Sequence, residues 1–297
     1  MENKFIDYFG FLPVPGEIEF SHGVVTPSPE IRNIVSEVRK EACRDGYIYP
    51  PLLKNAENIS TDDSRKYCNW GPPEPYYHLP ATHSLTLSLS QKSGQEPRYG
   101  LAGFIAHFLG FLFGYRVQFY DWRFEGRVNI SSSCTHSPPH LEQVTCLLES
   151  GIKIWSNWGL RKKTIAINAL YLHARTSSYE NEWEQFQSEY QIIDAVCYLA
   201  KVANHSHSQR LKKLCEKYSI PVDEEKFKTI VDLRNDLLHE AIWDGRMPGE
   251  IRSQFSLDAS SWLHKISKKA LLASFDVKGQ FIERNWWERW PEPFDIL

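Results

Sequence analysis

The feature that most constrains the fold is an abrupt change of pattern at residues 131–140, "SSSCTHSPPH". Before this segment, apolar residues recur at both strand and helix spacing. After it they recur almost only at the three- and four-residue spacing of amphipathic helices. A segment rich in serine and proline between two such patterns is typical of a linker. We therefore predict an α+β module over residues 1–132, followed by an all-α helical bundle over residues 133–297.

Four patterns in the first part indicate its mixed architecture. Residues 30–46 place apolar side chains at helical spacing, which predicts a helix. Residues 83–91 alternate leucine with small polar residues, as in a strand with one face against a core, and residues 115–131 alternate in a similar way. Residues 72–80 hold four prolines and are predicted to form a loop, because proline interrupts helices and strand pairing.

One apolar run raises the question of a membrane. Residues 99–115 contain no Asp, Glu, Lys or Arg over 17 positions. A membrane-spanning helix needs roughly 20 predominantly apolar residues, and this run also contains His107 and four glycines. We expect a buried helix over residues 101–113 and no membrane association; the alternative is a membrane contact through this segment.

The second part is predicted to be helical almost throughout. A proline and two acidic residues near Pro221 mark the start of one helix, which carries the motif discussed below. The other predicted helices cover residues 140–158, 163–174, 180–204, 208–218 and 258–275.

The six cysteines form no CxxC pair. Cys146 and Cys197 fall within apolar helical runs, so we expect buried thiols rather than disulfides. The N-terminus lacks the basic segment and long apolar run of a signal peptide. These features favour a reducing, cytoplasmic location.

The stretch "LRNDLLHEAIW", residues 233–243, places an arginine on the apolar face of a predicted helix. On an ideal helix Arg234 lies at the centre of the apolar stripe, and Asn235 and His239 neighbour each other on one flank. The residues that form this stripe are Phe227, Ile230, Val231, Leu237, Leu238 and Ala241. A guanidinium on an apolar face is costly unless an acidic or anionic group meets it.

Two interpretations of this arginine remain open. Arg234 is either a structural residue bonded to a neighbouring carboxylate or carbonyls, or part of an anion site. In such a site the arginine would bind a phosphate, His239 would carry a proton, and Asn235 would orient one or the other. Arg234 and His239 lie about 140° apart on an ideal helix, so the length of the arginine or a local distortion must bring them together.

The order Arg-Asn-x-x-x-His near the end of a helical domain resembles the signature of the HEPN superfamily (higher eukaryotes and prokaryotes nucleotide-binding). Residues 186–202, with Asp194 in an otherwise apolar stretch, resemble the helix that precedes this motif in the ApeA-like branch. The resemblance covers residues 140–275 approximately. It implies a HEPN helical-bundle domain and, because many members are metal-independent ribonucleases, RNA cleavage without a cofactor or metal ion.

The resemblance also implies a mechanism. An RNA 2′-hydroxyl would attack the adjacent phosphate, leaving a 2′,3′-cyclic phosphate and a 5′-hydroxyl. His239 would move a proton at the attacking or leaving oxygen, and Arg234 would hold the phosphate and neutralise its growing charge. Asn235 would orient His239 or contact RNA. Asp194 would position Arg234 or support the helix pair.

The resemblance further bears on partners. Family members usually build the site from two facing motifs, and this chain has one, so a homodimer is implied. Such proteins commonly act as toxins or anti-phage defence effectors, which makes residues 1–132 a candidate region for binding an antitoxin or sensing a trigger. The alternative is a non-catalytic HEPN module for dimerisation or nucleotide binding, in which Arg234 is structural.

RNA binding would have to be local, because a net charge of −3 provides no general basic field. His207, Arg210 and Lys212 are candidate RNA contacts; the alternative is that they lie on solvated loop and helix surface. The tryptophan-rich residues 284–294 could stack on bases or pack as a terminal segment on the protein or a dimer partner.

No cofactor or metal ion is expected. Cys134, His136 and His140 match no established zinc-ligand spacing. The chain lacks the nucleotide-binding glycine motifs, the HExxH motif of zinc proteases and the GxSxG motif of serine hydrolases. These absences leave chemistry that needs no cofactor.

Overall fold

The computed structural model describes most of the chain in two compact units. The described residues of unit 1 lie between Asn3 and Leu148, and those of unit 2 lie between Glu149 and Asp276. The predicted boundary between residues 132 and 133 and the tryptophan-rich segment both lie outside the described residues. The described ranges are 3–12, 14–49, 79–89, 96–122, 126–130, 141–179, 181–202, 206–243 and 254–276.

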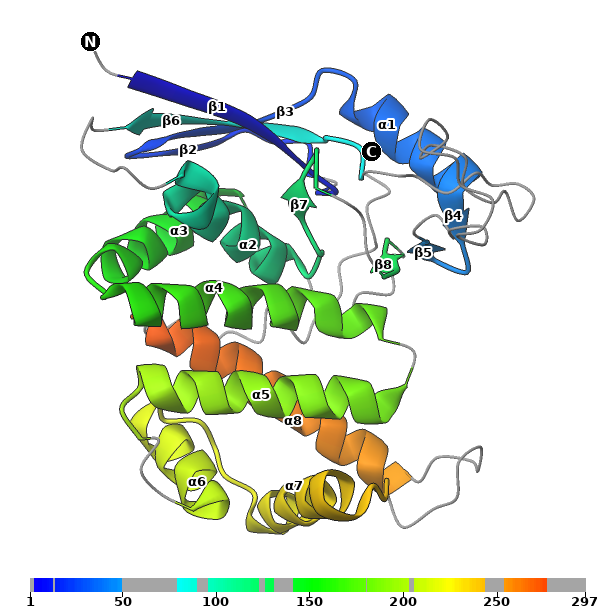
Figure 1. Ribbon diagram of the computed structural model, residues 1–297, viewed down its shortest axis with the longest axis vertical. Coiled ribbons are helices and arrows are strands. Elements are labelled where there is room, and N and C mark those ends of the chain that lie inside the picture. Colours follow the sequence, from blue (N-terminus) through cyan, green and yellow to red (C-terminus); the bar gives the residue numbers. More distant parts are fainter. Residues whose placement is uncertain are drawn as a thin grey trace, which may run out of the picture. The chain divides into compact units, whose positions relative to one another are not determined.

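Unit 1 contains a five-stranded antiparallel sheet in the order β2-β3-β6-β1-β7 (Figure 1). Its strands are β1 (Asn3–Gly10), β2 (Ile18–Phe20), β3 (Gly23–Pro27), β6 (His83–Leu89) and β7 (Gln118–Phe119). The prediction of β6 is confirmed. Leu85 and Leu87 are fully buried because alternate side chains of a strand point to the same face.

The apolar run of unit 1 forms α2 (Leu101–Phe113), as predicted. Every residue from Ala102 to Phe113 is buried, so the helix is apolar on all sides because it lies within a core. It ends at Gly114, whose φ of 72° is the left-handed conformation that glycine adopts readily. Among the described helices, none is both long and apolar enough to span a bilayer.

Two predictions for unit 1 are wrong in the region where it forms a second, smaller antiparallel sheet. The helix predicted over residues 30–46 divides into α1 (Ile31–Glu37), a π-helical turn η1 (Val38–Ala42) and strand β4 (Cys43–Arg44). The long strand predicted over residues 115–131 is also wrong. Among the described residues of this range, only β7 and β8 (Val128–Asn129) are strands, and they pair in different sheets: β7 with β1, and β8 with β5 (Tyr47–Ile48).

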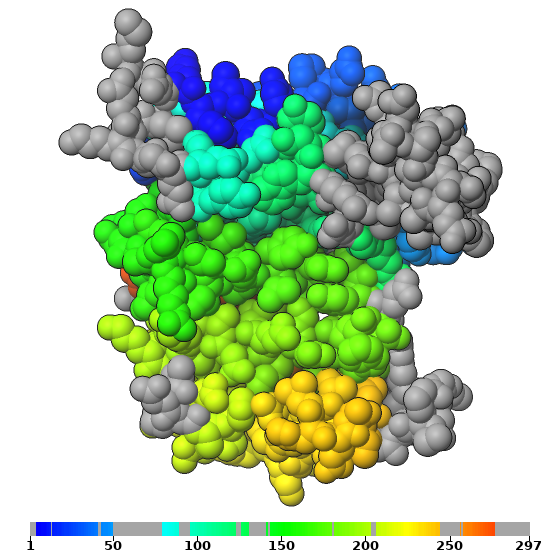
Figure 2. Space-filling view, viewed as in Figure 1, coloured from blue at the N-terminus to red at the C-terminus, as the bar shows by residue number. Residues whose placement is uncertain are grey.

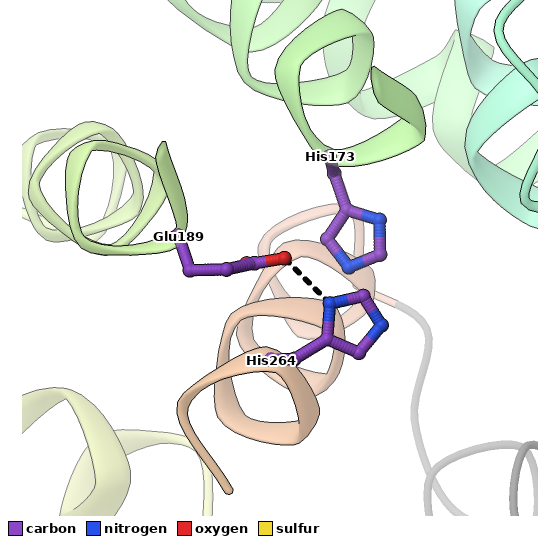
Figure 3. Close-up of side chains that lie close together, drawn as sticks. All are labelled: His173, Glu189 and His264. Carbon is purple, nitrogen blue, oxygen red and sulfur yellow. Dashed lines mark hydrogen bonds and ion pairs between the residues drawn. The ribbon is translucent and has the colours of Figure 1, made fainter. Parts of the chain in front are cut away.

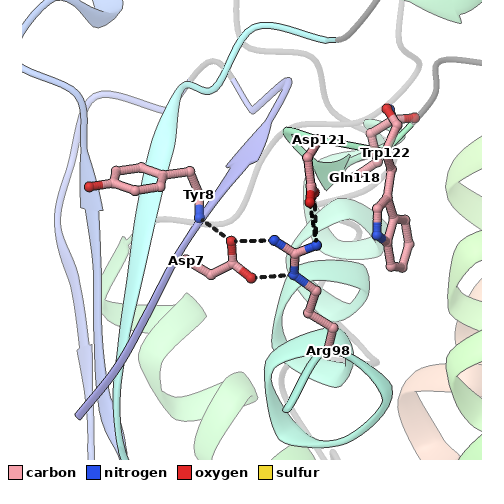
Figure 4. Close-up of polar contacts among 6 residues, drawn as sticks. All are labelled: Asp7, Tyr8, Arg98, Gln118, Asp121 and Trp122. Atoms are coloured by element: carbon pink, nitrogen blue, oxygen red, sulfur yellow. Dashed lines mark hydrogen bonds and ion pairs between the residues drawn. The ribbon is translucent and has the colours of Figure 1, made fainter. Parts of the chain in front are cut away.

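A largely buried ion pair ties strand β1 to the turn η3 (Pro97–Tyr99) that precedes α2 (Figure 4). Arg98 Nε and Nη2 lie 2.5 Å and 2.9 Å from the two carboxylate oxygens of Asp7. Arg98 Nη1 donates to Asp121 at 2.8 Å. The hydrogen bonds to Asp7, the largest cause, raise the pKa of Arg98. All three donor nitrogens of this guanidinium therefore face carboxylates.

Unit 2 is mainly helical, and each helix that the sequence predicts is present (Figure 1). The helix α5 contacts α4, α6 and α8, and α7 contacts α6 and α8. Together with the sheets of unit 1, this gives the chain its α+β character. The helices are α3 (Leu141–Ser156, which starts in unit 1), α4 (Leu160–Arg175), α5 (Glu182–Leu199), α6 (His207–Lys217), α7 (Glu224–Asn235) and α8 (Gln254–Ser274).

Two of three local predictions, the start of α7 and the burial of Cys197, are confirmed, and the burial of Cys146 is not. The carboxylate of Asp223 caps α7 by accepting from Lys226 N at 3.2 Å, which confirms the predicted start after Pro221. Cys197 is buried as predicted, but Cys146 is exposed. The prediction for Cys146 was wrong because the buried face of α3 runs through Val144, Leu147 and Leu148, on the other side of the helix.

Candidate anion-binding site

The helix α7 continues into a π-helical turn, η5 (Asp236–Glu240). In a π turn, hydrogen bonds join residues five apart instead of four, so residues five apart come onto nearly the same face. Arg234 and His239 are five apart, and Arg234 Nη1 lies 3.1 Å from His239 Nε2. The local distortion that the motif requires is therefore present, and it is a π turn.

The burial along α7 and η5 agrees with the predicted apolar stripe only in part. Phe227 and Ile230 are buried as expected, and Leu233, which the predicted stripe did not include, is buried too. Val231 and Leu237 are half-buried. Beyond them the stripe ends, since Leu238 is 45% exposed and Ala241 is exposed as well. The π turn changes the angular spacing after Leu233, so an ideal 100° step no longer gives the face of a residue. Arg234 thus lies half-buried where the core face ends.

The contacts of Arg234 are all with neutral side chains or imidazoles. Nη1 donates to Asn235 Oδ1 at 3.0 Å and lies near His239, while Nη2 lies 3.2 Å from His207 Nε2. The guanidinium also lies over the ring of Tyr190, with its central carbon 5.8 Å from the ring centroid. Within the described part of the chain, no carboxylate contacts Arg234, and its Nε meets no acceptor.

Asp194 contacts a different arginine from the one expected. Its Oδ1 accepts from Arg210 Nη1 at 2.9 Å, which joins α5 to α6. Arg210 and Arg234 both approach His207 Nε2, at 3.5 Å and 3.2 Å. Asp194 therefore supports a helix pair, α5 with α6, and reaches Arg234 only through Arg210 and His207. Two guanidinium groups and one carboxylate leave this cluster with a net positive charge.

The electrostatics of His207 favour its neutral form. Burial lowers its pKa most, and the positive charges of Arg234 and Arg210 lower it further, while Asp194 opposes them. A neutral His207 can accept a hydrogen bond at Nε2, which is the atom that both arginines approach. His207 was predicted as a possible RNA contact, and its place beside Arg234 also makes it a potential proton acceptor.

Tyr190 belongs to this cluster but was missed by the sequence reasoning. Its ring centroid lies 5.9 Å from that of His207, and burial, the largest cause, raises its pKa to about 12. The hydroxyl therefore stays protonated at neutral pH. Tyr190 lies four residues before Asp194, hence on the same face of α5, and this spacing is the signal that could have found it.

Lys212 does not join the cluster. Its ammonium lies 2.6 Å from Glu224 Oε1, and both side chains are exposed. Of the three predicted RNA contacts, the fold thus brings His207 and Arg210 to the Arg234 motif. The candidate zinc ligands Cys134, His136 and His140 lie outside the described residues.

The cluster lies at the surface of unit 2 and can receive an anion. The residues of α7 and η5, yellow to gold in Figure 2, form a patch at the surface of unit 2 in that view. His239 is exposed, while Arg234 and Asn235 are partly exposed. A phosphate oxygen could accept from the guanidinium in place of a neutral side chain, a stronger hydrogen bond because both partners are charged.

Comparisons with models of known protein families, with curated proteins and with solved structures find no match to this chain. The resemblance to the HEPN superfamily therefore rests on the motif and on the helices that carry it.

A second group of chemically active side chains in unit 2 went unnoticed in the sequence. His173, Glu189 and His264 come from α4, α5 and α8, and their side chains converge in the interior of the unit. No sequence spacing connects them, because each lies on a separate helix. A carboxylate within the apolar face of α5, between Phe186 and Ile192, was the one signal available.

Proposed function

We propose that this chain is a metal-independent endoribonuclease of the HEPN type. The observation that supports the proposal most is Arg234, a partly exposed guanidinium between two imidazoles that contacts no carboxylate in the described part of the chain. An arginine so placed suits a phosphate, and the two imidazoles suit proton transfer at the oxygens on either side of the phosphorus.

In the proposed reaction the RNA 2′-hydroxyl attacks the adjacent phosphorus and the bond from phosphorus to the 5′-oxygen breaks. His207, held neutral by its lowered pKa, takes the proton of the 2′-hydroxyl. His239 gives a proton to the departing 5′-oxygen. Each transfer by a positioned group contributes typically about 10²–10⁴-fold. The products are a 2′,3′-cyclic phosphate and a 5′-hydroxyl.

The remaining residues of the cluster position these groups. Arg234 donates to the phosphate oxygens as their negative charge grows. Asn235 and Tyr190 hold the guanidinium from two sides, through a hydrogen bond and a ring contact. Asp194 holds Arg210 against His207.

The proposal includes a homodimer that forms through unit 2. Leu238 and Ile242 support it, because these apolar side chains next to the site are 45% and 37% exposed. Exposed apolar side chains beside a polar cluster suit a protein interface. A role as a toxin or anti-phage defence effector, with an antitoxin or trigger acting through residues 1–132, belongs to the same proposal. Light scattering after gel filtration tests the dimer, and Leu238→Glu should yield monomers.

A second candidate is a non-catalytic HEPN module for dimerisation or nucleotide binding. It is favoured by the hydrogen bonds of Arg234 within the chain, which already orient the guanidinium. Such a module would bind nucleotides or RNA at Arg234 without cleaving them.

The test is cleavage of end-labelled tRNA and total RNA in EDTA by the wild type, His239→Ala and His207→Ala. Lys228→Gln is the control, since Lys228 is an exposed residue on the same helix. We expect cleavage with cyclic-phosphate ends by the wild type and control, and a loss of at least about 100-fold in each histidine variant. Equal cleavage by the wild type and His239→Ala would refute the proposed site, and RNA binding without cleavage would favour the second candidate.

A further inference from the structure

Two histidines and a glutamate converge between three helices of unit 2 (Figure 3). His173 comes from α4, Glu189 from α5 and His264 from α8. One nitrogen of each imidazole and one carboxylate oxygen all lie within 4.8 Å of one another. His173 and Glu189 are 3% and 2% exposed, so this group lies inside the unit.

The three side chains are in close contact with one another. The two imidazole rings stack with their centroids 4.6 Å apart and their planes at 28°. Glu189 Oε1 lies 2.5 Å from His264 Nδ1, the contact that is dashed in Figure 3. Ser267 donates its hydroxyl hydrogen to the other carboxylate oxygen and is itself fully buried. Ser267 thus holds one carboxylate oxygen of Glu189, and the other oxygen, Oε1, contacts His264.

The chemistry of this group fits a transition-metal cation. Two imidazole nitrogens and one carboxylate oxygen form a ligand set that zinc accepts, with a fourth position left for water. Imidazole also suits copper, iron and nickel, whereas calcium and magnesium prefer oxygen ligands alone. The Ser267 hydroxyl would act as the outer partner that orients a ligating carboxylate.

To bind an ion, the imidazole rings must rotate out of their stacked arrangement, and the ion must replace the hydrogen bond between Glu189 and His264. Tetrahedral zinc at roughly 2.1 Å from each ligand holds the ligand atoms about 3.4 Å apart. The candidate ligand atoms lie within 4.8 Å of one another, so their separations must shorten by up to about 1.4 Å on binding. The side chain of His264 is 25% exposed, which gives the ion a route from solvent.

We propose that His173, Glu189 and His264 form a binding site for one divalent transition-metal ion, with Zn²⁺ as the ion to test. The bound ion cross-links α4, α5 and α8 and stabilises unit 2. It takes no part in RNA cleavage, so this proposal does not depend on the proposed function.

The test is calorimetric titration of the full chain, without an affinity tag, with ZnCl₂ after dialysis against EDTA and its removal. We expect one Zn²⁺ per chain, and a rise in the melting temperature of unit 2 on binding. Co²⁺ should give the visible absorption of a four- or five-coordinate site. If the wild type binds no Zn²⁺ and shows no such Co²⁺ spectrum, the proposal is wrong.

Variants locate the ion. Glu189→Gln keeps the shape of the side chain and should lower the Zn²⁺ affinity by at least 100-fold, as should His264→Ala. Ser267→Ala should lower it by about 10- to 100-fold, the usual effect of losing an outer partner. His239→Ala is the matched control, and its affinity should equal that of the wild type. Circular dichroism in EDTA verifies folding; Zn²⁺ binding that Glu189→Gln and His264→Ala leave unchanged would place the ion elsewhere and refute the site.

Discussion

The two units each contain a partly buried arginine near a helix end, and the two arginines have opposite surroundings. In unit 1, Arg98 donates from Nε, Nη1 and Nη2 to the carboxylates of Asp7 and Asp121. In unit 2, Arg234 contacts an amide oxygen and two imidazole nitrogens. One guanidinium has its charge balanced by acidic partners, while the other has none in the described part of the chain.

This difference separates a structural arginine from an arginine suited to a ligand. The charge of Arg98 is neutralised within the fold, so an external anion would have to compete with two carboxylates. In the described part of the chain, the partners of Arg234 are dipoles and a ring, which a phosphate can replace or add to. The alternative that Arg234 is a structural residue bonded to a carboxylate therefore has no support from its contacts. The hydrogen bonds of Arg234 to neutral partners are the contacts on which the second candidate function rests.

The largest expected effect is on stability, at Asp7. Asp7→Asn leaves the Arg98 guanidinium with the exposed Asp121 as its remaining charged partner among the described residues, and we expect a loss of about 3–5 kcal/mol in the free energy of unfolding. Asp121→Asn is the control, because the side chain of Asp121 is 47% exposed and its ion pair should contribute about 1 kcal/mol or less. Urea denaturation measures both. Equal losses in the two variants would mean that burial does not distinguish the two carboxylates.

The next effect is on cleavage, at Arg234. Arg234→Gln should lower kcat/KM for RNA by about 10²–10³-fold, as removal of a group that stabilises transition-state charge does. Its free energy of unfolding should change by less than about 1 kcal/mol, because a partly exposed arginine without an ion pair is lost. Lys228→Gln removes the same charge from the same helix and should cleave like the wild type. A large loss of stability in Arg234→Gln would mean that Arg234, like Arg98, is a structural residue.

Unit 1 should also lose stability in acid through two buried histidines. Burial lowers the pKa of both His83 and His107 to about 4, the positive Arg116 contributing at His107. In the unfolded chain these groups take up protons near pH 6.5, whereas in the folded chain they stay neutral until about pH 4. Their contribution is complete above pH 6.5 and is lost as the pH falls toward 4.

We expect a loss of roughly 2 kcal/mol per histidine between pH 7 and pH 5. His107→Gln should remove one of the two contributions, which urea denaturation at both pH values measures. A pH dependence equal to that of the wild type would show that His107 does not titrate as described.

The smallest expected effect is at the end of the π turn. Ala241 has a φ of 57°, a left-handed conformation that is strained for alanine. Ala241→Gly should therefore stabilise the chain, by up to about 1 kcal/mol once the greater entropy of unfolded glycine is counted. Ala195→Gly, within α5, should destabilise it by about 1 kcal/mol. A loss of stability in Ala241→Gly would argue against the left-handed end of this turn.

The sequence predicts the elements that depend on local pattern. The helices from α3 to α8 and strand β6 follow from periodicity, because the side chains that face the core repeat along a single segment, and α2 follows from its continuous apolar run. The Arg234 motif was found for the same reason, since its three residues lie within one helix and its continuation. The π turn was not predicted, because a sequence pattern gives no indication of where a helix gains an extra residue per turn.

Contacts between distant segments could not be predicted. Asp7 and Arg98 are 91 positions apart, and His173, Glu189 and His264 lie on three helices. Their partners are set by how elements pack, and a single sequence does not specify that packing. The pairing of Asp194 with Arg210 rather than Arg234 has the same origin.

The most direct test of the central claim is RNA binding at Arg234, measured without cleavage. A fluorescent 2′-O-methyl RNA, which lacks the attacking hydroxyl, is titrated with the wild type, Arg234→Gln and Lys228→Gln at several salt concentrations. A phosphate contact at Arg234 predicts weaker binding of Arg234→Gln and a dependence of log affinity on log salt that is shallower by about one unit. Lys228→Gln should match the wild type. The same affinity and the same salt dependence in the wild type and Arg234→Gln would contradict the claim that Arg234 binds RNA phosphate.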